Sequence, residues 1–193
     1  MVMRILSKCL RAIQVFFRHL NSMLHKAFFW LSYYPNITFD PGVLLLGKVR
    51  IVASDGGKIH IRNRAMISAG SQLIAKRGII TIGNDVFIGT DAVLVANESI
   101  TIGNDVLIAE RVSIRDQSHG MKSGVVFRSQ PTTSSPVRIS NNVWLGASAF
   151  VGSGITIDDD VIVGANAVVT KNLASGSIYA GVPALKIKDI IGE

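Results

Sequence analysis

The residues of this chain best suited to chemistry lie in one stretch, residues 115–136, which reads RDQSHGMKSGVVFRSQPTTSSP. His119 is followed by Gly120, which frees the local backbone, and Asp116 precedes it by three positions. Imidazole is the side chain best suited to accept a proton near neutral pH, so His119 is a candidate general base. Asp116 could orient that imidazole or bind a polar group of a substrate. A single loop histidine is weak evidence by itself, so the elements that position it must be considered.

Those elements are marked by aliphatic residues that recur at every sixth position. The series comprises Ile61, Ile67, Leu73, Ile82, Ile88, Leu94, Ile102, Ile108, Ile114, Ile139, Leu145, Val151, Ile157, Val163 and Val169. An α-helix repeats near 3.6 residues and a half-buried strand at 2, so neither explains this spacing. A six-residue step is typical of a parallel β-helix, in which each repeat forms one flat side of a coil. We therefore predict an all-β solenoid with one aliphatic stack along its axis.

The corners of the predicted coils are also visible. Residues 80–88 read ITIGNDVFI and residues 100–108 read ITIGNDVLI, so Gly, Asn and Asp follow an inward aliphatic in both. These residue types tolerate the left-handed or tightly turned backbone of a corner. Three sides of six residues predict about eighteen residues per coil and roughly six coils between residues 43 and 169. The repeat slips at residues 76–79 and 95–99, where we expect extra residues to bulge outward. It is interrupted by residues 115–136, and so long a loop in a compact fold usually has a function.

Composition agrees with this fold and limits the alternatives. Hydrophobic residues make up 48% of the 193 residues and glycine occurs 18 times, as expected for an aliphatic core with many corners. Cys9 is the single cysteine, so no intramolecular disulfide can form. We expect no signal peptide and no transmembrane span, because the N-terminal segment carries charges throughout and lacks a long uncharged apolar stretch.

Residues 1–34 form an N-terminal arm with a different pattern. Its polar positions step by three or four: Arg4, Ser7, Lys8, Arg11, Gln14, Arg18, Asn21, Ser22 and His25. Apolar residues lie between them, which predicts an amphipathic helix with a wide apolar side, continuous or in two pieces. Of the 20 Lys and Arg residues of the chain, five lie in the arm, which contains none of the 13 acidic residues. The positive charge of +7 therefore belongs largely to the arm, and we expect no nucleic-acid partner.

Two interpretations of the arm stay open. Its apolar side could pack on the solenoid or on its counterparts in an oligomer. Alternatively, it could be an interfacial helix, with its basic side toward anionic lipid and its aromatic residues toward acyl chains. Five aromatic residues gather near its end: Phe28, Phe29, Trp30, Tyr33 and Tyr34. They suit either interpretation.

Three further motifs carry a resemblance to a known family. They are NNVWLGA at residues 141–147, VGANAVVTK at 163–171 and AGVPA at 180–184. With the repeats, they make residues 43–188 similar to the hexapeptide-repeat acyltransferases, particularly the sugar O-acetyltransferases related to galactoside, maltose and nodulation-factor acetyltransferases. The resemblance implies a left-handed parallel β-helix, an exception to the usual right-handed crossover, and assembly as a homotrimer. It also implies acetyl transfer from acetyl-CoA to a hydroxyl in a cleft between subunits, without a metal.

The resemblance assigns roles to particular residues. His119 stands at the position of the family's catalytic histidine and would remove the proton of the acceptor hydroxyl, with backbone N–H groups stabilising the oxyanion. Apart from the resemblance, Asp116 could orient this histidine or bind a sugar hydroxyl, and Asn97 lies one coil earlier, where an acceptor could be held. The residues that would bind coenzyme A are Trp144, Ala147, Ala165, Thr170, Lys171 and Lys188. Trp144 could instead be a corner aromatic that packs on the next coil.

The sequence also departs from the family. Leu185 replaces a residue that is basic in relatives, so one phosphate contact would be missing or moved. Many relatives have two or three histidines in the loop, whereas this chain has His119 alone, which implies a different acceptor pocket. A γ-type carbonic anhydrase needs three converging histidines, and residues 35–193 contain only His60 and His119. The aspartates at 158–160 would point in different directions from a turn, so we expect no metal there.

We predict three segments: the arm at 1–34, the β-helix at 35–185 with the inserted loop 115–136, and a C-terminal tail at 186–193. The function that we favour is O-acetylation of a glycan hydroxyl in surface polysaccharide biosynthesis. Three alternatives stay open: a soluble acetyltransferase for a small acceptor such as serine, an antibiotic or a nucleotide sugar; an amino-sugar N-acetyltransferase; and a non-catalytic trimeric scaffold. We expect a cytoplasmic protein, and the interfacial interpretation of the arm places it on the inner face of the membrane.

Overall fold

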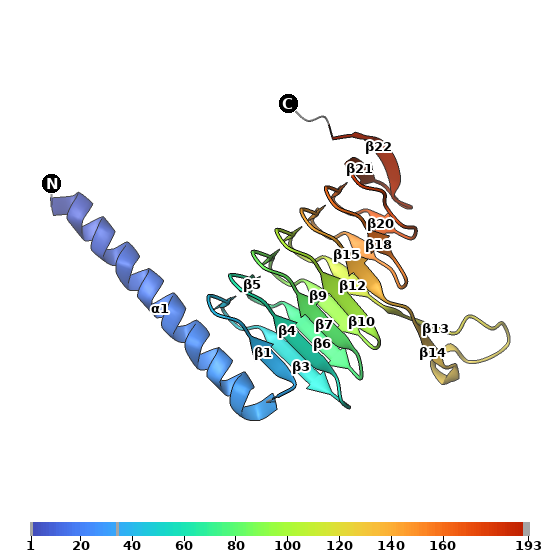
Figure 1. Cartoon of the computed structure of the whole chain (residues 1–193), viewed down its shortest axis with the longest axis horizontal. Coiled ribbons are helices and arrows are strands. Elements are labelled where there is room, and N and C mark those ends of the chain that lie inside the picture. Colours follow the sequence, from blue (N-terminus) through green and yellow to red (C-terminus); the bar gives the residue numbers. More distant parts are fainter. Residues whose placement is uncertain (1, 34, 191–193) are drawn as a thin grey trace.

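A computed structural model describes residues 2–33 and 35–190. One long helix, α1 (Val2–Tyr33), precedes a solenoid whose coils stack in a single direction (Figure 1). Each coil contributes one short strand to each of three parallel sheets, which form the three sides of the solenoid. The architecture is the left-handed parallel β-helix that the sequence predicted.

We call the three sheets A, B and C in the order in which the chain visits them. Sheet A contains β1 (Ile37–Phe39), β4 (Lys58–Ile61), β7 (Ile79–Ile82), β10 (Ser99–Ile102), β15 (Val137–Ile139) and β18 (Thr156–Ile157). Sheet B contains β2 (Leu44–Leu46), β5 (Met66–Ser68), β8 (Phe87–Ile88), β11 (Leu107–Ile108), β16 (Trp144–Leu145), β19 (Ile162–Val163), β21 (Ser177–Ala180) and β22 (Leu185–Asp189). Sheet C contains β3 (Arg50–Ser54), β6 (Gln72–Lys76), β9 (Val93–Ala96), β12 (Ser113–Arg115), β17 (Phe150–Val151) and β20 (Val168–Val169).

The core is the aliphatic stack that the six-residue spacing predicts. Every member of that series is buried, with at most 1% of its surface exposed. The structure adds a second buried column that the spacing analysis did not include, formed by the residues two positions earlier on each side. On sheet B this column contains Val86, Val106, Val143 and Val161. Two inward residues per side fill the narrow interior of the coil.

The corners between sheets A and B are held by a ladder of amide and carboxylate side chains. It runs from coil to coil through Asp40, Asn63, Asn84, Asn104, Asn141 and Asp159. At each step from Asn84 onward, a side-chain oxygen accepts the backbone N–H of the preceding coil, as when Asn104 Oδ1 accepts the Asn84 N–H at 2.9 Å. Gly83 must be glycine at such a corner, because a Cβ there would lie 2.1 Å from the Gly103 carbonyl oxygen. The repeated Gly-Asn-Asp sequence therefore encodes the corner.

This ladder makes a testable prediction for stability. Replacing Asn104 by alanine removes the acceptor of the Asn84 N–H, and we expect the free energy of unfolding to fall by about 1 kcal/mol. Asn104→Asp keeps the oxygen and is the matched control, since Asp159 serves as the acceptor one step further along the ladder. Chemical denaturation of both variants measures the effect. Equal destabilisation by the two substitutions would show that the acceptor oxygen is not what matters.

The slips in the repeat lengthen sheet C rather than bulge outward. Strands β3 and β6 have five residues each, whereas β17 and β20, after the last slip, have two. The predicted outward bulge is therefore wrong, because the extra residues lengthen the strand and the corner that follows it. Arg77 occupies that corner with a φ of 65°, in the left-handed region.

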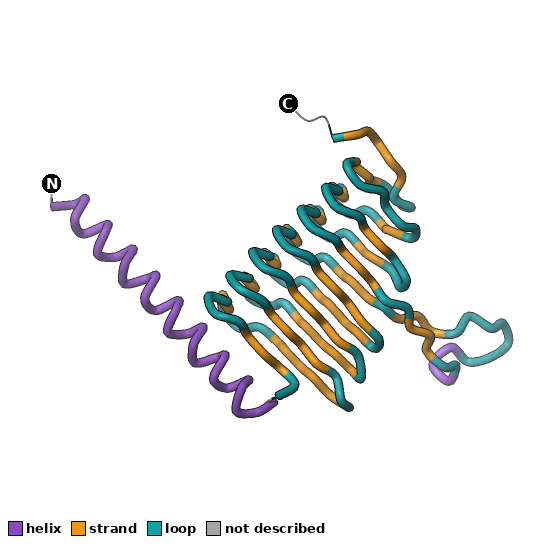
Figure 2. Tube along the Cα trace, in the orientation of Figure 1, coloured by secondary structure: helices purple, strands orange, loops and turns teal. Residues whose placement is uncertain are grey.

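Helix α1 lies across the N-terminal end of the solenoid, transverse to the stacking direction of the coils, and extends past it (Figures 1 and 2). Its C-terminal part contacts β1 and β2, the first strands of sheets A and B. Among the described helices, none combines the length and apolarity of a membrane-spanning segment. The predicted tail instead begins as strand β22, which pairs antiparallel with β21 at the last edge of sheet B.

Candidate functional site

The candidate catalytic loop is a hairpin that projects from one corner of the solenoid. It leaves the end of β12 in sheet C and returns to β15 in sheet A, so it stands at the corner between these two sheets (Figure 1). Strands β13 (Gln117–His119) and β14 (Thr132–Ser134) form its antiparallel stem, and a short 3-10 helix at Phe127–Ser129 lies near its tip. The loop that the sequence predicted is thus an ordered two-stranded ribbon rather than an irregular excursion.

One side of this ribbon is lined with polar groups. Gln117 and His119 are two positions apart on β13, so their side chains lie on the same side. Ser134 and Thr132 are their cross-strand partners and share that side. The His119 side chain is exposed, and the Oε1 of Gln117 is a buried oxygen without a hydrogen-bond partner in the described structure. Imidazole, an amide and two hydroxyls therefore gather where a hydroxylated substrate could be held.

Asp116 is completely buried at the base of the hairpin. Its carboxylate accepts the backbone N–H of Asn97 at 2.9 and 3.0 Å and that of Glu98 at 2.7 Å. Its carbonyl oxygen accepts the Ser135 N–H, at the other end of the hairpin, at 2.8 Å. None of these bonds involves His119, so the predicted direct orientation of the imidazole by Asp116 has no counterpart in this geometry. Asp116 instead forms a clamp, by which we mean that its hydrogen bonds hold the base of the hairpin to the preceding coil.

The tip of the hairpin is held together by a second polar side chain, Gln130, which the sequence analysis did not single out. The side-chain amide of Gln130 accepts the Lys122 N–H at 2.8 Å and donates to the carbonyl oxygens of Lys122 and Val125, each at 3.0 Å. A glutamine has no spacing signal by which a sequence could reveal such a role.

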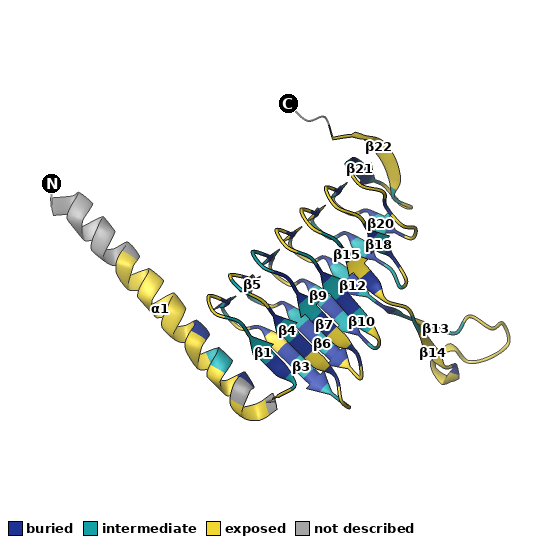
Figure 3. Cartoon of the chain, viewed as in Figure 1, coloured by how far each residue is buried: buried dark blue, intermediate teal, exposed yellow. Residues whose placement is uncertain are grey.

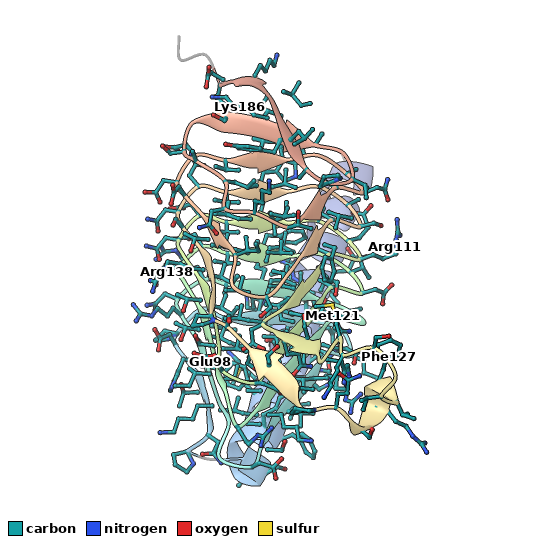
Figure 4. All side chains as sticks on the ribbon, turned by 90° about the vertical axis from the view of Figure 1, so that its right-hand side faces the viewer. Glu98, Arg111, Met121, Phe127, Arg138 and Lys186 are labelled. Atoms are coloured by element: carbon teal, nitrogen blue, oxygen red, sulfur yellow. The ribbon has the colours of Figure 1, made fainter. Side chains whose placement is uncertain are left out.

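The tip of the hairpin carries exposed apolar side chains. Met121 is 85% exposed and Phe127 is 65% exposed, and Figure 4 shows Phe127 on the projecting hairpin. Together with His119, Gly120 and Arg128 they line a cavity of about 340 Å³. His119 therefore borders a cavity whose lining is largely apolar.

The residues predicted to bind the acceptor and coenzyme A fall into three groups, two of which lie at corners of the solenoid. Asn97, Thr170 and Lys171 lie at the same corner as the hairpin, because they follow β9 and β20 of sheet C. Ala147 and Ala165 lie at the next corner, between sheets B and C, where the Asn166 N–H donates to the Ala147 carbonyl oxygen at 2.8 Å. These two corner groups are separated by the width of sheet C.

Trp144 and Lys188 lie on the outer side of sheet B. The register places Trp144, Ile162, Ile178 and Lys188 in one column across β16, β19, β21 and β22, with Leu107 on the other side of Trp144. Trp144 is on a strand and 50% exposed, so it is not a corner aromatic packed on the next coil. It borders two cavities of about 490 and 350 Å³. Sheet B faces away from the corner that carries the hairpin, so Trp144 and His119 do not meet within one chain.

The C-terminal strand β22 carries the remaining predicted cation. All five of its residues are exposed, including Lys188 and Leu185. Lys186 lies on the same strand (Figure 4). Its ammonium donates to the carboxylate of Asp189 at 2.5 Å, which raises the pKa of the lysine and lowers that of the carboxyl group. In the described residues, no group of three or more His, Cys, Asp or Glu side chains could hold a metal.

Comparison with known proteins identifies the family. Residues 136–171 match the bacterial transferase hexapeptide (six repeats) model, and residues 79–110 match the hexapeptide repeat of succinyl-transferase. The putative lipopolysaccharide biosynthesis O-acetyl transferase WbbJ of Escherichia coli is 34% identical over 146 residues, which are 67% of this chain and 74% of that protein. The chain belongs to the hexapeptide-repeat acyltransferases.

A second curated relative is a sugar O-acetyltransferase. Galactoside O-acetyltransferase of E. coli is 33% identical over 116 residues, 58% of this chain and 54% of that enzyme, so the chain spans about half of that relative's length. In structure, the acyltransferase resembles a variant of AntD, an N-acyltransferase from Bacillus cereus in complex with dTDP and coenzyme A. The TM-score is 0.71 at 23% identity, over 85% of this chain and 88% of AntD, and it shows a shared fold.

Proposed function

We propose that this acyltransferase transfers an acetyl group from acetyl-CoA to a hydroxyl of a glycan, at sites formed between the copies of a homotrimer. The observation that carries the proposal is the division of the predicted residues between the hairpin corner and sheet B. A cleft lined by both groups requires the hairpin of one copy to approach sheet B, or the corner beside it, of another. The exposed apolar tip at Met121 and Phe127 suits such a contact, because it has no apolar cover in the single chain.

In the proposed reaction, His119 accepts the proton of the acceptor hydroxyl as its oxygen attacks the thioester carbonyl. A C–O bond forms and the carbonyl becomes a tetrahedral oxyanion, which backbone N–H groups at a corner would stabilise. Collapse breaks the C–S bond, and the CoA sulfur leaves with the proton returned by His119. No nucleophilic side chain is needed, because both substrates are held together and the acceptor attacks directly.

Acceptor binding falls to the polar side of the hairpin and to Asn97 beside its base. The Oε1 of Gln117 has no hydrogen-bond partner among the described residues, and a rotation of this side chain would expose it to accept a hydrogen bond from a sugar hydroxyl. A surface built from amide and hydroxyl groups suits a glycan better than an apolar acceptor. Asp116 acts in this scheme as a positioning residue, since its carboxylate is engaged with the backbone of the previous coil.

Coenzyme A would lie along sheet B and the corner beside it. Trp144 would form an apolar wall for the pantetheine arm, next to Ala147 and Ala165, and Lys188 would meet the phosphates. In the register of sheet B, Trp144 and Lys188 are three strands apart, about 14 Å at the usual spacing of strands. Thr170 and Lys171 lie at the hairpin corner, so those of the neighbouring copy would contact the nucleotide end of coenzyme A.

Transfer to oxygen rather than nitrogen is supported by two of the curated relatives, galactoside O-acetyltransferase and WbbJ, which cover more of this chain than the curated N-acetyltransferases that it also matches, whereas the likeness to AntD concerns the fold. The description of WbbJ also supports a role in surface polysaccharide biosynthesis. The product distinguishes the two reactions, because mild alkali cleaves an acetyl ester and leaves an acetamide intact. We expect labelled acetyl transferred to an oligosaccharide to be released by alkali. Label that resists alkali would indicate N-acetylation and overturn this part of the proposal.

Division of the site between copies predicts complementation. His119→Ala should inactivate one wall of the cleft, and Ala165→Tyr should obstruct the opposite wall. If the two walls come from different copies, random co-assembly of the two variants leaves about one quarter of the sites with both native walls. We therefore expect co-expression to restore about a quarter of wild-type activity, whereas each variant alone stays inactive. No recovery in a proven mixed oligomer would place the site within a single chain.

A further inference from the structure

Helix α1 is attached to the solenoid by its polar side. Ser22 accepts the backbone N–H of Leu45 at 2.9 Å, and the Lys26 ammonium donates to the Val43 carbonyl oxygen at 2.9 Å. Phe29, which lies on the same stripe at i+7 from Ser22, is buried against Phe39 with ring centroids 6.3 Å apart. Partial burial lowers the pKa of Lys26, as expected for an ammonium withdrawn from water into the contact. The docked stripe is therefore defined by Ser22, Lys26 and Phe29.

The apolar side of α1 consequently points away from the solenoid. Its described members with more than a third of their surface exposed are Ile13, Phe16, Phe17, Leu20, Met23, Leu24, Phe28 and Leu31. Met23, Leu24 and Phe28 are each more than 60% exposed although they flank the docked residues. Figure 3 shows exposed residues along the described part of the helix. Packing on the solenoid of the same chain, one of the interpretations that the sequence left open, is thus ruled out for these residues.

The charge of the arm indicates what covers this apolar side. Residues 1–34 contain no acidic residue and five Lys or Arg residues, of which Lys26 is docked on the solenoid and the other four precede the docked stripe in sequence. Several copies of such a helix packed together would concentrate positive charge, whereas an anionic surface would neutralise it. An apolar side rich in Phe and Leu combined with a basic polar side is the pattern of a helix that lies in the plane of a bilayer interface.

We propose that α1 binds the surface of an anionic lipid bilayer, with its apolar side among the acyl chains and the solenoid on the aqueous side. The position of the helix fits this role, because it lies across one end of the solenoid and leaves the hairpin and the later coils clear of it (Figure 1). The surface is independent of the catalytic assignment, since it uses no residue of the proposed site.

Flotation with vesicles tests the proposal. The full-length protein is mixed either with vesicles of phosphatidylcholine and phosphatidylglycerol or with phosphatidylcholine alone. We expect binding to the anionic vesicles, weaker binding to the neutral ones, and partial release by high salt. The variant Phe16→Gln/Leu20→Gln/Leu24→Gln removes three apolar contacts from one side of the helix. Its partition into anionic vesicles should fall about 100-fold or more.

The matched control is Gln14→Ala/Asn21→Ala, which changes exposed positions outside the apolar side and keeps the charge. It should bind as the wild type does, and helix content by circular dichroism should be unchanged in both variants. Failure of the wild type to bind anionic vesicles would overturn the proposal, as would equal binding by the triple variant. A smaller oligomer for the triple variant in light scattering, without any vesicle binding by the wild type, would assign the apolar side to another copy of the chain instead.

Discussion

Replacement of His119 by alanine should lower turnover by about 10²–10⁴-fold, because the acceptor hydroxyl loses the group that removes its proton. Binding of coenzyme A should be unchanged, since the proposed contacts lie on sheet B and at the corners rather than on β13. The oligomer should also persist, because the exposed tip of the hairpin is unaltered. Steady-state rates, together with calorimetric titration of coenzyme A, measure the two effects separately.

Ser118→Ala is the control for this prediction. Ser118 lies on the opposite side of the ribbon from His119 and is also exposed. Its loss should change turnover by less than threefold, a modest effect for a surface position away from the reacting groups. Unchanged turnover in His119→Ala would refute the general-base assignment. A comparable loss in both variants would indicate that the ribbon itself, rather than the imidazole, had been disturbed.

Replacement of Asp116 should affect stability and activity together. Asp116→Ala leaves the part-buried N–H groups of Asn97 and Glu98 without their carboxylate acceptor, and we expect a loss of about 2–4 kcal/mol in the free energy of unfolding. Turnover should also fall in the folded protein, because the clamp at the base of the hairpin positions His119. Denaturant titration and kinetics at a temperature where the variant stays folded measure these two effects.

Asp116→Asn separates positioning from proton transfer. Its remaining carbonyl oxygen can still accept a backbone N–H, so a positioning role predicts partial recovery of both stability and turnover relative to alanine. A role as the direct partner of the imidazole predicts instead that asparagine is as inactive as alanine although it restores stability. The second result would contradict the geometry described above.

Much of the fold could be predicted because short sequence motifs specify each side and corner and recur from coil to coil. The six-residue series places each inward aliphatic without knowledge of its neighbours, and every member is buried. The Gly-Asn-Asp corners were visible for the same reason. The ladder through Asn84 and Asn104 was not, because it depends on the coil length that brings one corner above the next. The second buried column was missed because its residues alternate between valine, alanine and isoleucine, without a uniform type.

The members of the candidate site stay a prediction from the resemblance, and their geometry could not be predicted from the sequence. The resemblance selected His119, Trp144 and Lys188, yet only the structure places the first at a corner and the other two on the opposite sheet. Sequence could not reveal that the Asp116 carboxylate bonds to backbone N–H groups, since such partners leave no trace in residue type. The docking of α1 was equally hidden. A wide apolar side normally indicates the buried side of a helix, whereas here two polar side chains and Phe29 make the contact.

The most direct test of the account is consumption of acetyl-CoA by the wild-type protein, followed as thiol release, with and without mono- and oligosaccharide acceptors. The account predicts release that depends on a sugar hydroxyl and yields an alkali-labile acetyl ester. Absence of release with every acceptor, together with absence of coenzyme A binding in a calorimetric titration, would contradict it and would leave the solenoid as a non-catalytic scaffold.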